Sequence, residues 1–282
     1  AGGTLIKGNI EVDNAIGILK ESASFPLRIA GEILPSPIPN KESRVYREPV
    51  GVVGVISPWN FPLHLAMRSV APAIACGNAV VLKPATETYI SGGLLLGKLF
   101  EEAGLPPGVL NVIVGQGSEI GDAIVTNPKP SLISFTGSTP VGRGIGEKAG
   151  KCLKRVALEL GGNNAMIVLD DANVSDAADA AVFGSYMHQG QICIALNRVL
   201  VHSSMYDEFV EAVKSRVEKL KSGDPTREGV FIGPIINDDQ KEKILEIVSK
   251  SEEQGARKVL GGGVSNRVIE PILLADVTAD MK

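Results

Sequence analysis

From residue 51 onward, short runs rich in valine and isoleucine alternate with stretches whose apolar residues recur at helical spacing, and this alternation leaves few folds open. The runs are VGVVGVI, NAVVLKP, LNVIV, SLISFTG and RVALEL. Strands that alternate with helices are typical of a parallel sheet covered by helices on both faces. We therefore predict an α/β fold with a Rossmann-like parallel sheet, the usual architecture of a nucleotide-binding domain.

A second series of strands and helices begins after Gly162. It contains the runs AMIVL and NRVLVH and predicted helices over 174–188, 206–220 and 238–253. The glycine pair at 161 and 162 marks a plausible boundary between the two series. We predict a nucleotide-binding α/β domain over 1–161 and a second α/β domain over 162–282.

The first fifty residues have a different pattern. Apolar positions at helical spacing predict a helix over 8–24, and the proline-rich segment PSPIPNKES predicts a turn between two extended segments. The result would be a protruding hairpin over about 30–50. A protruding strand edge favours subunit pairing. For the full-length protein we predict a homo-oligomer, a dimer or a tetramer.

Composition excludes several classes of partner. The 282 residues carry 28 basic and 32 acidic side chains, a formal net charge of −4, which gives no basic field for nucleic acid. The longest apolar run, 69–82, is interrupted by Gly77 and Asn78 and is too short to span a membrane. The three cysteines lack metal-ligand or redox spacing, so we predict no metal and a reducing, cytoplasmic location.

Two residues near the middle of the chain suggest covalent chemistry on a carbonyl. Glu159 opens the sequence Glu-Leu-Gly-Gly, and Cys193 closes the sequence Gly-Gln-Ile-Cys. A soft nucleophile and a candidate base are the minimum equipment for that chemistry. Taken alone, the cysteine would be interpreted as a small buried hydrophobe and the glutamate as a surface or capping residue.

Polar and glycine-rich loops follow the predicted strands. Asn60, in Ser-Pro-Trp-Asn-Phe-Pro, offers an amide donor for an oxyanion, or it is simply a turn residue. The segment Phe-Thr-Gly-Ser-Thr-Pro-Val-Gly, 135–142, predicts a helix start able to face a pyrophosphate. Gly117 lies in a near match to the dinucleotide fingerprint, but the third glycine comes one residue late, which favours a tight turn. Lys83 ends a strand, where it would bind ribose or phosphate or be solvated.

Together, SPWNFP, KPA, FTGSTPVG, ELGG and GQIC resemble the aldehyde dehydrogenase superfamily, in order and across nearly the whole chain. The resemblance implies NAD or NADP as cofactor, bound by the domain over 1–161, and an aldehyde as substrate, with 162–282 as the catalytic domain. It also implies a thiohemiacetal and then a thioester on the nucleophile Cys193, hydride transfer to the nicotinamide, and water activated by the general base Glu159. The oxyanion would be held by Asn60 and the Cys193 backbone N–H. The cofactor would be bound by Lys83, Gly137, Ser138, Gly142, Gly117, Trp59 and Thr86.

Three departures from the family pattern refine this expectation. Thr86 stands where many NAD-preferring members carry a glutamate that binds ribose hydroxyls, so we predict that NADP is accepted, although the neighbouring Glu87 complicates this interpretation. Ser69 replaces a lysine, and RSVAPA with HQGQIC looks most like the benzaldehyde and vanillin dehydrogenase branch, which implies an aromatic aldehyde. The family's Glu-x-Phe-Gly-Pro segment and its C-terminal strand have no counterpart here, so we expect an internal portion of a longer enzyme, with an incomplete catalytic domain.

Two alternatives remain open at this stage. A relative that transfers its thioester to coenzyme A or phosphate would have no use for the water activation that Glu159 implies. A catalytically silent piece kept for assembly or binding is disfavoured by the intact Cys193, Glu159 and Asn60.

Overall fold

The computed structural model describes residues 2–281. Contacts between residues divide the chain into two compact units, one of Ile10–Leu160 and one of Ala1–Asn9 with Gly161–Lys282. We call them the sheet unit and the cysteine unit. The break in the chain falls beside the glycine pair at 161 and 162. The predicted first domain began at residue 1, whereas the structure groups the first nine residues with the cysteine unit.

The sheet unit is built on five parallel strands in the order β5-β4-β3-β6-β7. They are β3 (Val52–Ile56), β4 (Ala79–Lys83), β5 (Leu110–Val112), β6 (Pro130–Thr136) and β7 (Arg155–Glu159). The chain winds outward from β3 to β5, then crosses back to place β6 on the other side of β3. This reversal makes β3 and β6 the topological switch point, where ligands bind in open α/β sheets.

Helices cover both faces of this sheet, which confirms the predicted architecture. The connecting helices are α3 (Pro62–Ala75), α4 (Leu95–Glu102), α5 (Gly117–Thr126) and α6 (Thr139–Lys151). Successive side chains of a strand point to opposite faces. Accordingly, Val53 and Val55 of β3 join one core cluster, whereas Ile56 joins the other.

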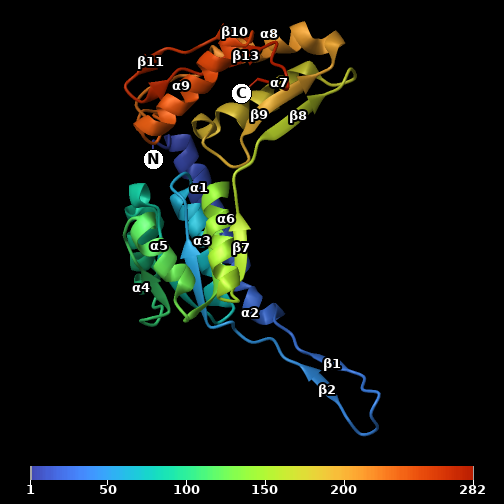
Figure 1. The fold of residues 1–282 in the computed structure, drawn as a ribbon, viewed down its shortest axis with the longest axis vertical. Coiled ribbons are helices and arrows are strands. Elements are labelled where there is room, and N and C mark those ends of the chain that lie inside the picture. Colours follow the sequence, from blue (N-terminus) through green and yellow to red (C-terminus); the bar gives the residue numbers. More distant parts are fainter. Residues whose placement is uncertain (1, 282) are drawn as a thin grey trace. The chain divides into compact units, whose positions relative to one another are not determined.

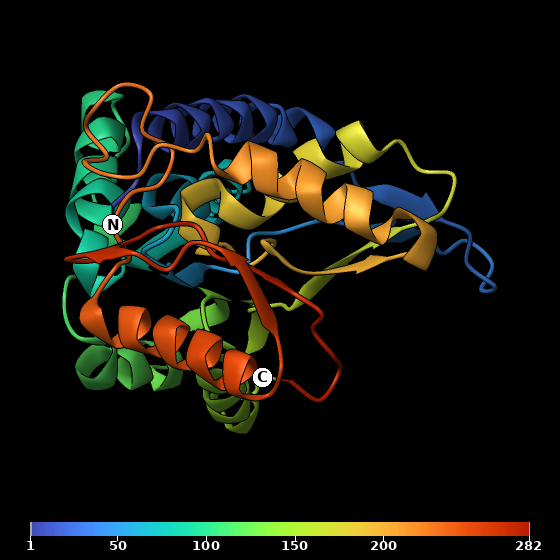
Figure 2. The same ribbon diagram turned by 90° about the horizontal axis from the view of Figure 1, so that it is seen from above.

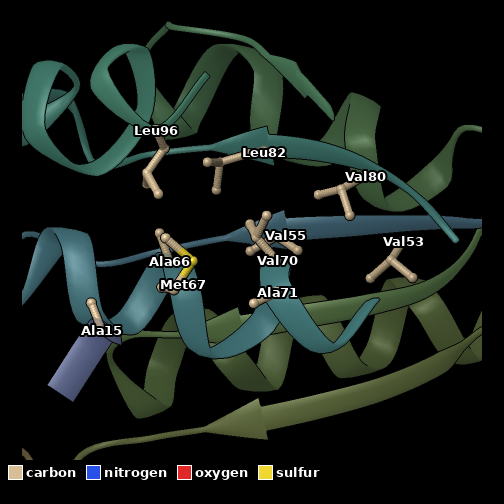
Figure 3. Close-up of a cluster of buried hydrophobic side chains, with 10 residues drawn as sticks. All are labelled: Ala15, Val53, Val55, Ala66, Met67, Val70, Ala71, Val80, Leu82 and Leu96. Carbon is tan, nitrogen blue, oxygen red and sulfur yellow. The ribbon is translucent and has the colours of Figure 1, made fainter. Parts of the chain in front are cut away.

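The first cluster packs α3, α4 and the long helix α1 (Leu5–Ala23) against β3 and β4 (Figure 3). Its members are Ala15, Val53, Val55, Ala66, Met67, Val70, Ala71, Val80, Leu82 and Leu96. The second cluster packs α5 and α6 against β6, through Ile124, Val125, Ile133, Phe135, Ile145 and Ala149. Burial of these side chains is the main stabilising term for the unit.

The predicted hairpin is present. Strands β1 (Glu32–Leu34) and β2 (Ser43–Val45) pair antiparallel after the short helix α2 (Phe25–Arg28), and the hairpin extends away from the parallel sheet (Figure 1). Its apolar side chains are exposed, with Ile33 at 68% and Tyr46 at 71%. The hairpin therefore contributes little to the core of its own unit.

The cysteine unit has a smaller parallel pair, β8 (Asn164–Val168) with β9 (Leu196–Val201). Helices α7 (Val174–Tyr186) and α8 (Tyr206–Val217) pack on it through one apolar cluster (Figures 1 and 2). Helix α9 (Asp238–Glu253) follows, and then β10 (Arg257–Leu260), which pairs antiparallel with β13 (Leu273–Ala275). Strands β11 (Val264–Ser265) and β12 (Val268–Ile269) form a small hairpin between them.

Short helical turns complete the description: η1 (Thr86–Thr88), the π-helical η2 (Ile90–Leu94), η3 (Met187–Gly190) and η4 (Ser203–Met205). The helix predicted over 174–188 ends earlier, at Tyr186. Its last predicted turn is replaced by η3, in which His188 and Gln189 have φ of 51° and 57°. Left-handed backbone cannot continue a right-handed helix. Within the described residues, no helix is both long enough and apolar enough to cross a membrane.

Candidate functional site

The carboxyl edge of the five-stranded sheet gathers most of the predicted site residues. Lys83 and Glu159 are the last residues of β4 and β7, and Asn60 lies in the loop that follows β3. The loop after β6 holds Gly137 and Ser138. Because the carboxyl ends of parallel strands meet at one edge, these residues lie along a single rim of the sheet unit.

Asn60 is held at the start of α3. Its Oδ1 accepts a hydrogen bond from Phe61 N at 3.0 Å. An amide whose oxygen is used in this way presents its NH2 group as the donor, which is the group that an oxyanion requires. The adjacent Trp59 is half-buried.

A buried carboxylate from α1 anchors the same helix start. Glu11 Oε1 accepts from Leu63 N at 2.7 Å and from His64 N at 3.2 Å, although 52 residues separate Glu11 from Leu63. The first N–H groups of a helix lack partners within the helix, and α3 has no side-chain cap of its own. Glu11 therefore replaces the local cap and fixes the segment that carries Asn60.

Lys83 is buried, with 4% of its surface exposed, and its Nζ donates to Pro84 O at 3.0 Å. Burial lowers the pKa of the Lys83 ammonium, and the charge of Glu87 opposes that shift in part. Thr86 is half-buried, and its Oγ1 donates to Gly115 O at 3.4 Å, which links the loops after β4 and β5.

The β6 loop leads directly into a helix start. Gly137 N donates to the carbonyl of Glu159 at 3.0 Å, so the loop is tied to the end of β7. Ser138 is the N-cap of α6 with extended backbone, and its side chain does not cap the helix. The start of α6 thus offers backbone N–H groups of the kind that bind phosphate.

Two of the predicted glycines lie within the helices that follow β5 and β6. Gly142 is one turn into α6, where a Cβ atom would overlap Leu160 Cδ2, so its absence of a side chain serves the packing of α6. Gly117 is the first residue of α5 and has open space where a Cβ would lie. Neither glycine contacts Asn60 within the part of the chain that the structure describes.

The Glu159 carboxylate has a cationic neighbour that the sequence interpretation missed. Arg68 Nη2, on α3, lies 3.7 Å from Glu159 Oε2 and 3.5 Å from Thr136 Oγ1. The Glu159 side chain is 64% exposed and open to solvent. The available signal was a single charged residue in the otherwise apolar helix sequence LAMRSVAPAI. The next residue, Ser69, is within 2.9 Å of Ser134 on β6.

Cys193 belongs to the cysteine unit and is half-buried in the segment between η3 and β9. Three successive residues before it, His188, Gln189 and Gly190, have positive φ. The Gln191 side chain accepts from Ile236 N at 3.0 Å and donates to His188 O at 3.3 Å. These contacts hold a strained turn immediately before the cysteine.

The two units carry different chemical groups. The sheet unit offers an amide donor, a buried cation, a helix N-terminus and a solvent-exposed carboxylate, and the cysteine unit offers a half-buried thiol in a constrained turn. A phosphate-bearing cofactor suits the first set, and covalent attack on a carbonyl suits the second.

Comparison with known proteins identifies the family of this chain. The model of the aldehyde dehydrogenase family matches residues 1–282. The vanillin dehydrogenase of Corynebacterium glutamicum is 52% identical over 100% of this chain and 59% of its own length. A benzaldehyde dehydrogenase of Bacillus subtilis is 53% identical over 98% of this chain and 57% of its own length.

The fold agrees with the sequence match. The crystal structure of an NAD-dependent benzaldehyde dehydrogenase from Corynebacterium glutamicum superposes with a TM-score of 0.94 at 52% identity. The match covers 99% of this chain and 61% of that one. The chain thus spans less than two thirds of the length of these relatives. With the family model matched from end to end and the fold shared, the chain belongs to the aldehyde dehydrogenase family.

Proposed function

We propose that this chain forms part of an NAD(P)-dependent aldehyde dehydrogenase that oxidises an aromatic aldehyde to the carboxylic acid. The observation that carries the proposal is the sheet edge, where an amide donor, a buried cation and a carboxylate follow three strands of one parallel sheet. Relatives at 52% and 53% identity are named for vanillin and benzaldehyde, which supports an aromatic substrate.

Cys193 is the proposed nucleophile. As a thiolate it adds to the aldehyde carbon, and the carbonyl oxygen takes the displaced electron pair to become an alkoxide. The Asn60 NH2 group and the Cys193 backbone N–H would stabilise that charge. After oxidation the acyl group remains on Cys193 as a thioester. Glu159 then takes a proton from water, and the resulting hydroxide releases the acid.

The cofactor proposal rests on the fit of the sheet edge to a dinucleotide. The N–H groups at the start of α6, beside Gly137 and Ser138, suit a pyrophosphate. Lys83 would donate to ribose hydroxyls or phosphate oxygens. When bound, NAD(P)⁺ supplies the hydride acceptor for the oxidation.

Thr86 supports acceptance of NADP as well as NAD. Its hydroxyl is directed to Gly115 O and adds no negative charge to the loop after β4. A 2'-phosphate would meet less repulsion there than beside a carboxylate at this position. Glu87, the next residue, is exposed and is the remaining acidic side chain of this turn.

The test is to incubate the protein with benzaldehyde and either NAD or NADP, following nicotinamide absorbance and trapping of the thioester. We expect a burst of reduced cofactor with both, and acyl transfer to Cys193. Glu159→Gln should keep the burst and lower steady-state turnover by about 10²–10⁴-fold, because only deacylation needs the base. Cys193→Ser should abolish the burst, and the matched control Cys152→Ser, at an exposed cysteine, should keep it.

Each contrary outcome has a distinct meaning. A burst that survives Cys193→Ser would contradict the assigned nucleophile. Strict use of NAD would contradict the interpretation of Thr86. Release of the acyl group only on addition of coenzyme A would favour a thioester-transferring relative. No burst with any variant would favour a catalytically silent piece with an assembly or binding role.

A further inference from the structure

Cys193 occupies a tight turn that is closed by a backbone hydrogen bond from a residue that follows it. Ala195 N donates to Ile192 O at 3.0 Å, which closes a four-residue turn with Cys193 at its second position. Ile192 O and Cys193 N–H belong to the same peptide group. Since a trans peptide directs its C=O and N–H to opposite sides, the Cys193 N–H points out of the turn.

One side-chain amide holds this turn from outside. Asn164 Nδ2 donates to Cys193 O at 2.9 Å and to Ala195 O at 2.9 Å, so both of its hydrogens are used on the same turn. Asn164 is itself fixed as the first residue of β8, where its backbone N donates to Asn197 Oδ1 at 3.2 Å. The turn is thereby tied to the β8–β9 pair.

Gly162 completes the arrangement by leaving space for it. A Cβ atom at this position would lie 3.0 Å from Cys193 O, 3.2 Å from Asn164 Oδ1 and 3.3 Å from Asn164 Nδ2. A methyl group there would press on the hydrogen bond between Asn164 and Cys193. The second glycine of Glu-Leu-Gly-Gly therefore has a packing reason in this unit.

We propose that Asn164 is a positioning residue for the nucleophile: its amide fixes the Ile192–Ala195 turn and so sets the direction of the Cys193 thiol and backbone N–H. The inference rests on the proposed function of Cys193. Without the two donations, the turn samples other conformations, and both the attacking sulfur and the oxyanion donor leave their reactive geometry. Misplacement of reacting groups by about 1 Å costs on the order of 10²-fold in rate.

The first test measures the thiol directly and does not depend on turnover. Alkylation of each cysteine is timed by peptide mass spectrometry in the unmodified chain, in Asn164→Ala and in Asn164→Asp. We expect faster alkylation of the half-buried Cys193 in both variants, because a loosened turn exposes it. Cys76, which is also partly buried, reports any general opening of the fold and should react at its original rate.

The second test measures catalysis. With benzaldehyde and NAD, both variants should show a burst rate about 10- to 100-fold lower, with an unchanged KM for the cofactor. Asn164→Asp should lose at least as much as Asn164→Ala, since a carboxylate oxygen would face two carbonyl oxygens. Gly162→Ala, whose methyl group would press on the same hydrogen bond, should also raise the alkylation rate of Cys193 and lower the burst rate.

Asn163→Ala is the matched control, since Asn163 is the same residue type, adjacent and exposed. It should leave both the alkylation rate of Cys193 and the burst unchanged. The proposal is overturned if Cys193 in Asn164→Ala is alkylated at the rate found in this control. A different result, a burst that does not require Cys193, would contradict the proposed function.

Discussion

Among single residues, Lys83 is a clear case of a charged group that this fold buries at a cost in stability. Its side chain is 4% exposed, its Nζ donates to the Pro84 carbonyl, and burial lowers its pKa. A buried cation that forms no ion pair within the described residues costs stability, because the protein interior solvates its charge less well than water does. Such a residue at the rim of the sheet is better explained by a ligand than by folding.

Replacement by an apolar side chain of similar length should therefore separate stability from binding. We expect Lys83→Met to raise the free energy of unfolding by about 0.5–2 kcal/mol and to weaken cofactor binding. Urea unfolding and cofactor titration measure the two quantities. Lys98→Met, at an exposed lysine of α4, is the control and should change neither. A destabilised Lys83→Met protein would contradict the argument.

The lowered pKa of Lys83 also predicts a pH dependence. Between its folded-state pKa and the ordinary value of 10.5, the unfolded chain binds more protons at this site than the folded chain does. The contribution of Lys83 to the free energy of unfolding therefore rises with pH across that window. This rise should be missing from Lys83→Met when unfolding is compared at neutral pH and just below the ordinary lysine pKa.

At the scale of elements, α3 depends on a partner far away in the sequence. The Glu11 carboxylate on α1 caps the N–H groups of Leu63 and His64 and so fixes the loop that carries Asn60. Glu11 is 6% exposed, so the bonds it makes are shielded from water. The start of α3 is thus set by tertiary structure, since its own N-cap residue, Phe61, has no side chain able to cap it.

Removing this cap should destabilise the sheet unit. We expect Glu11→Ala to lower the free energy of unfolding by about 1–2 kcal/mol, because two helix N–H groups lose their acceptor in a buried site. Asp13→Ala, at an exposed acidic residue of the same helix, should change it little. Urea unfolding of both variants is the measurement, and equal stabilities would rule out the capping role.

Helices and strands can be predicted from the sequence where their own apolar pattern determines them, and cannot where distant contacts do. The five strands of the parallel sheet were identified from their valine and isoleucine runs, and α9 was placed over 238–253 as found, because periodicity reports burial directly. The π-helical η2 could not be identified. It depends on Gly92 and Gly93, where Cβ atoms would lie 2.9 Å from Pro62 and 2.5 Å from Pro84, residues distant in sequence.

The site residues likewise divide into those that local sequence identifies and those that depend on distant contacts. Asn60 and Lys83 could be placed at the ends of predicted strands, since each comes at or just after a recognisable apolar run. Arg68 and Asn164 were missed, because their roles come from a 3.7 Å ion pair and from two carbonyl oxygens that only the folded chain brings near. The single charge in LAMRSVAPAI marks Arg68 but does not identify its partner, and the local sequence carries no signal for the contacts of Asn164.

At the scale of the whole molecule, the β1–β2 hairpin is an exposed apolar surface with no core of its own. Ile33 pairs with Arg44, so Ile33 and Tyr46 lie on the same face of the hairpin, at 68% and 71% exposure. The opposite face carries Leu34, at 43%, and Val45, at 37%. Exposed apolar faces on a two-stranded hairpin are typical of surfaces buried by association.

We therefore expect the chain to self-associate through this hairpin. Ile33→Glu with Tyr46→Glu should shift the mass measured by light scattering toward the monomer, because charges replace the apolar side chains of one face. Lys41→Glu, near the hairpin tip, also adds negative charge but leaves that face intact and should keep the original mass. The expected change is in assembly alone, since neither Ile33 nor Tyr46 belongs to a core cluster and thermal unfolding of dilute protein should be unaffected. An oligomer that persists in the double variant would contradict association through the face that carries Ile33 and Tyr46.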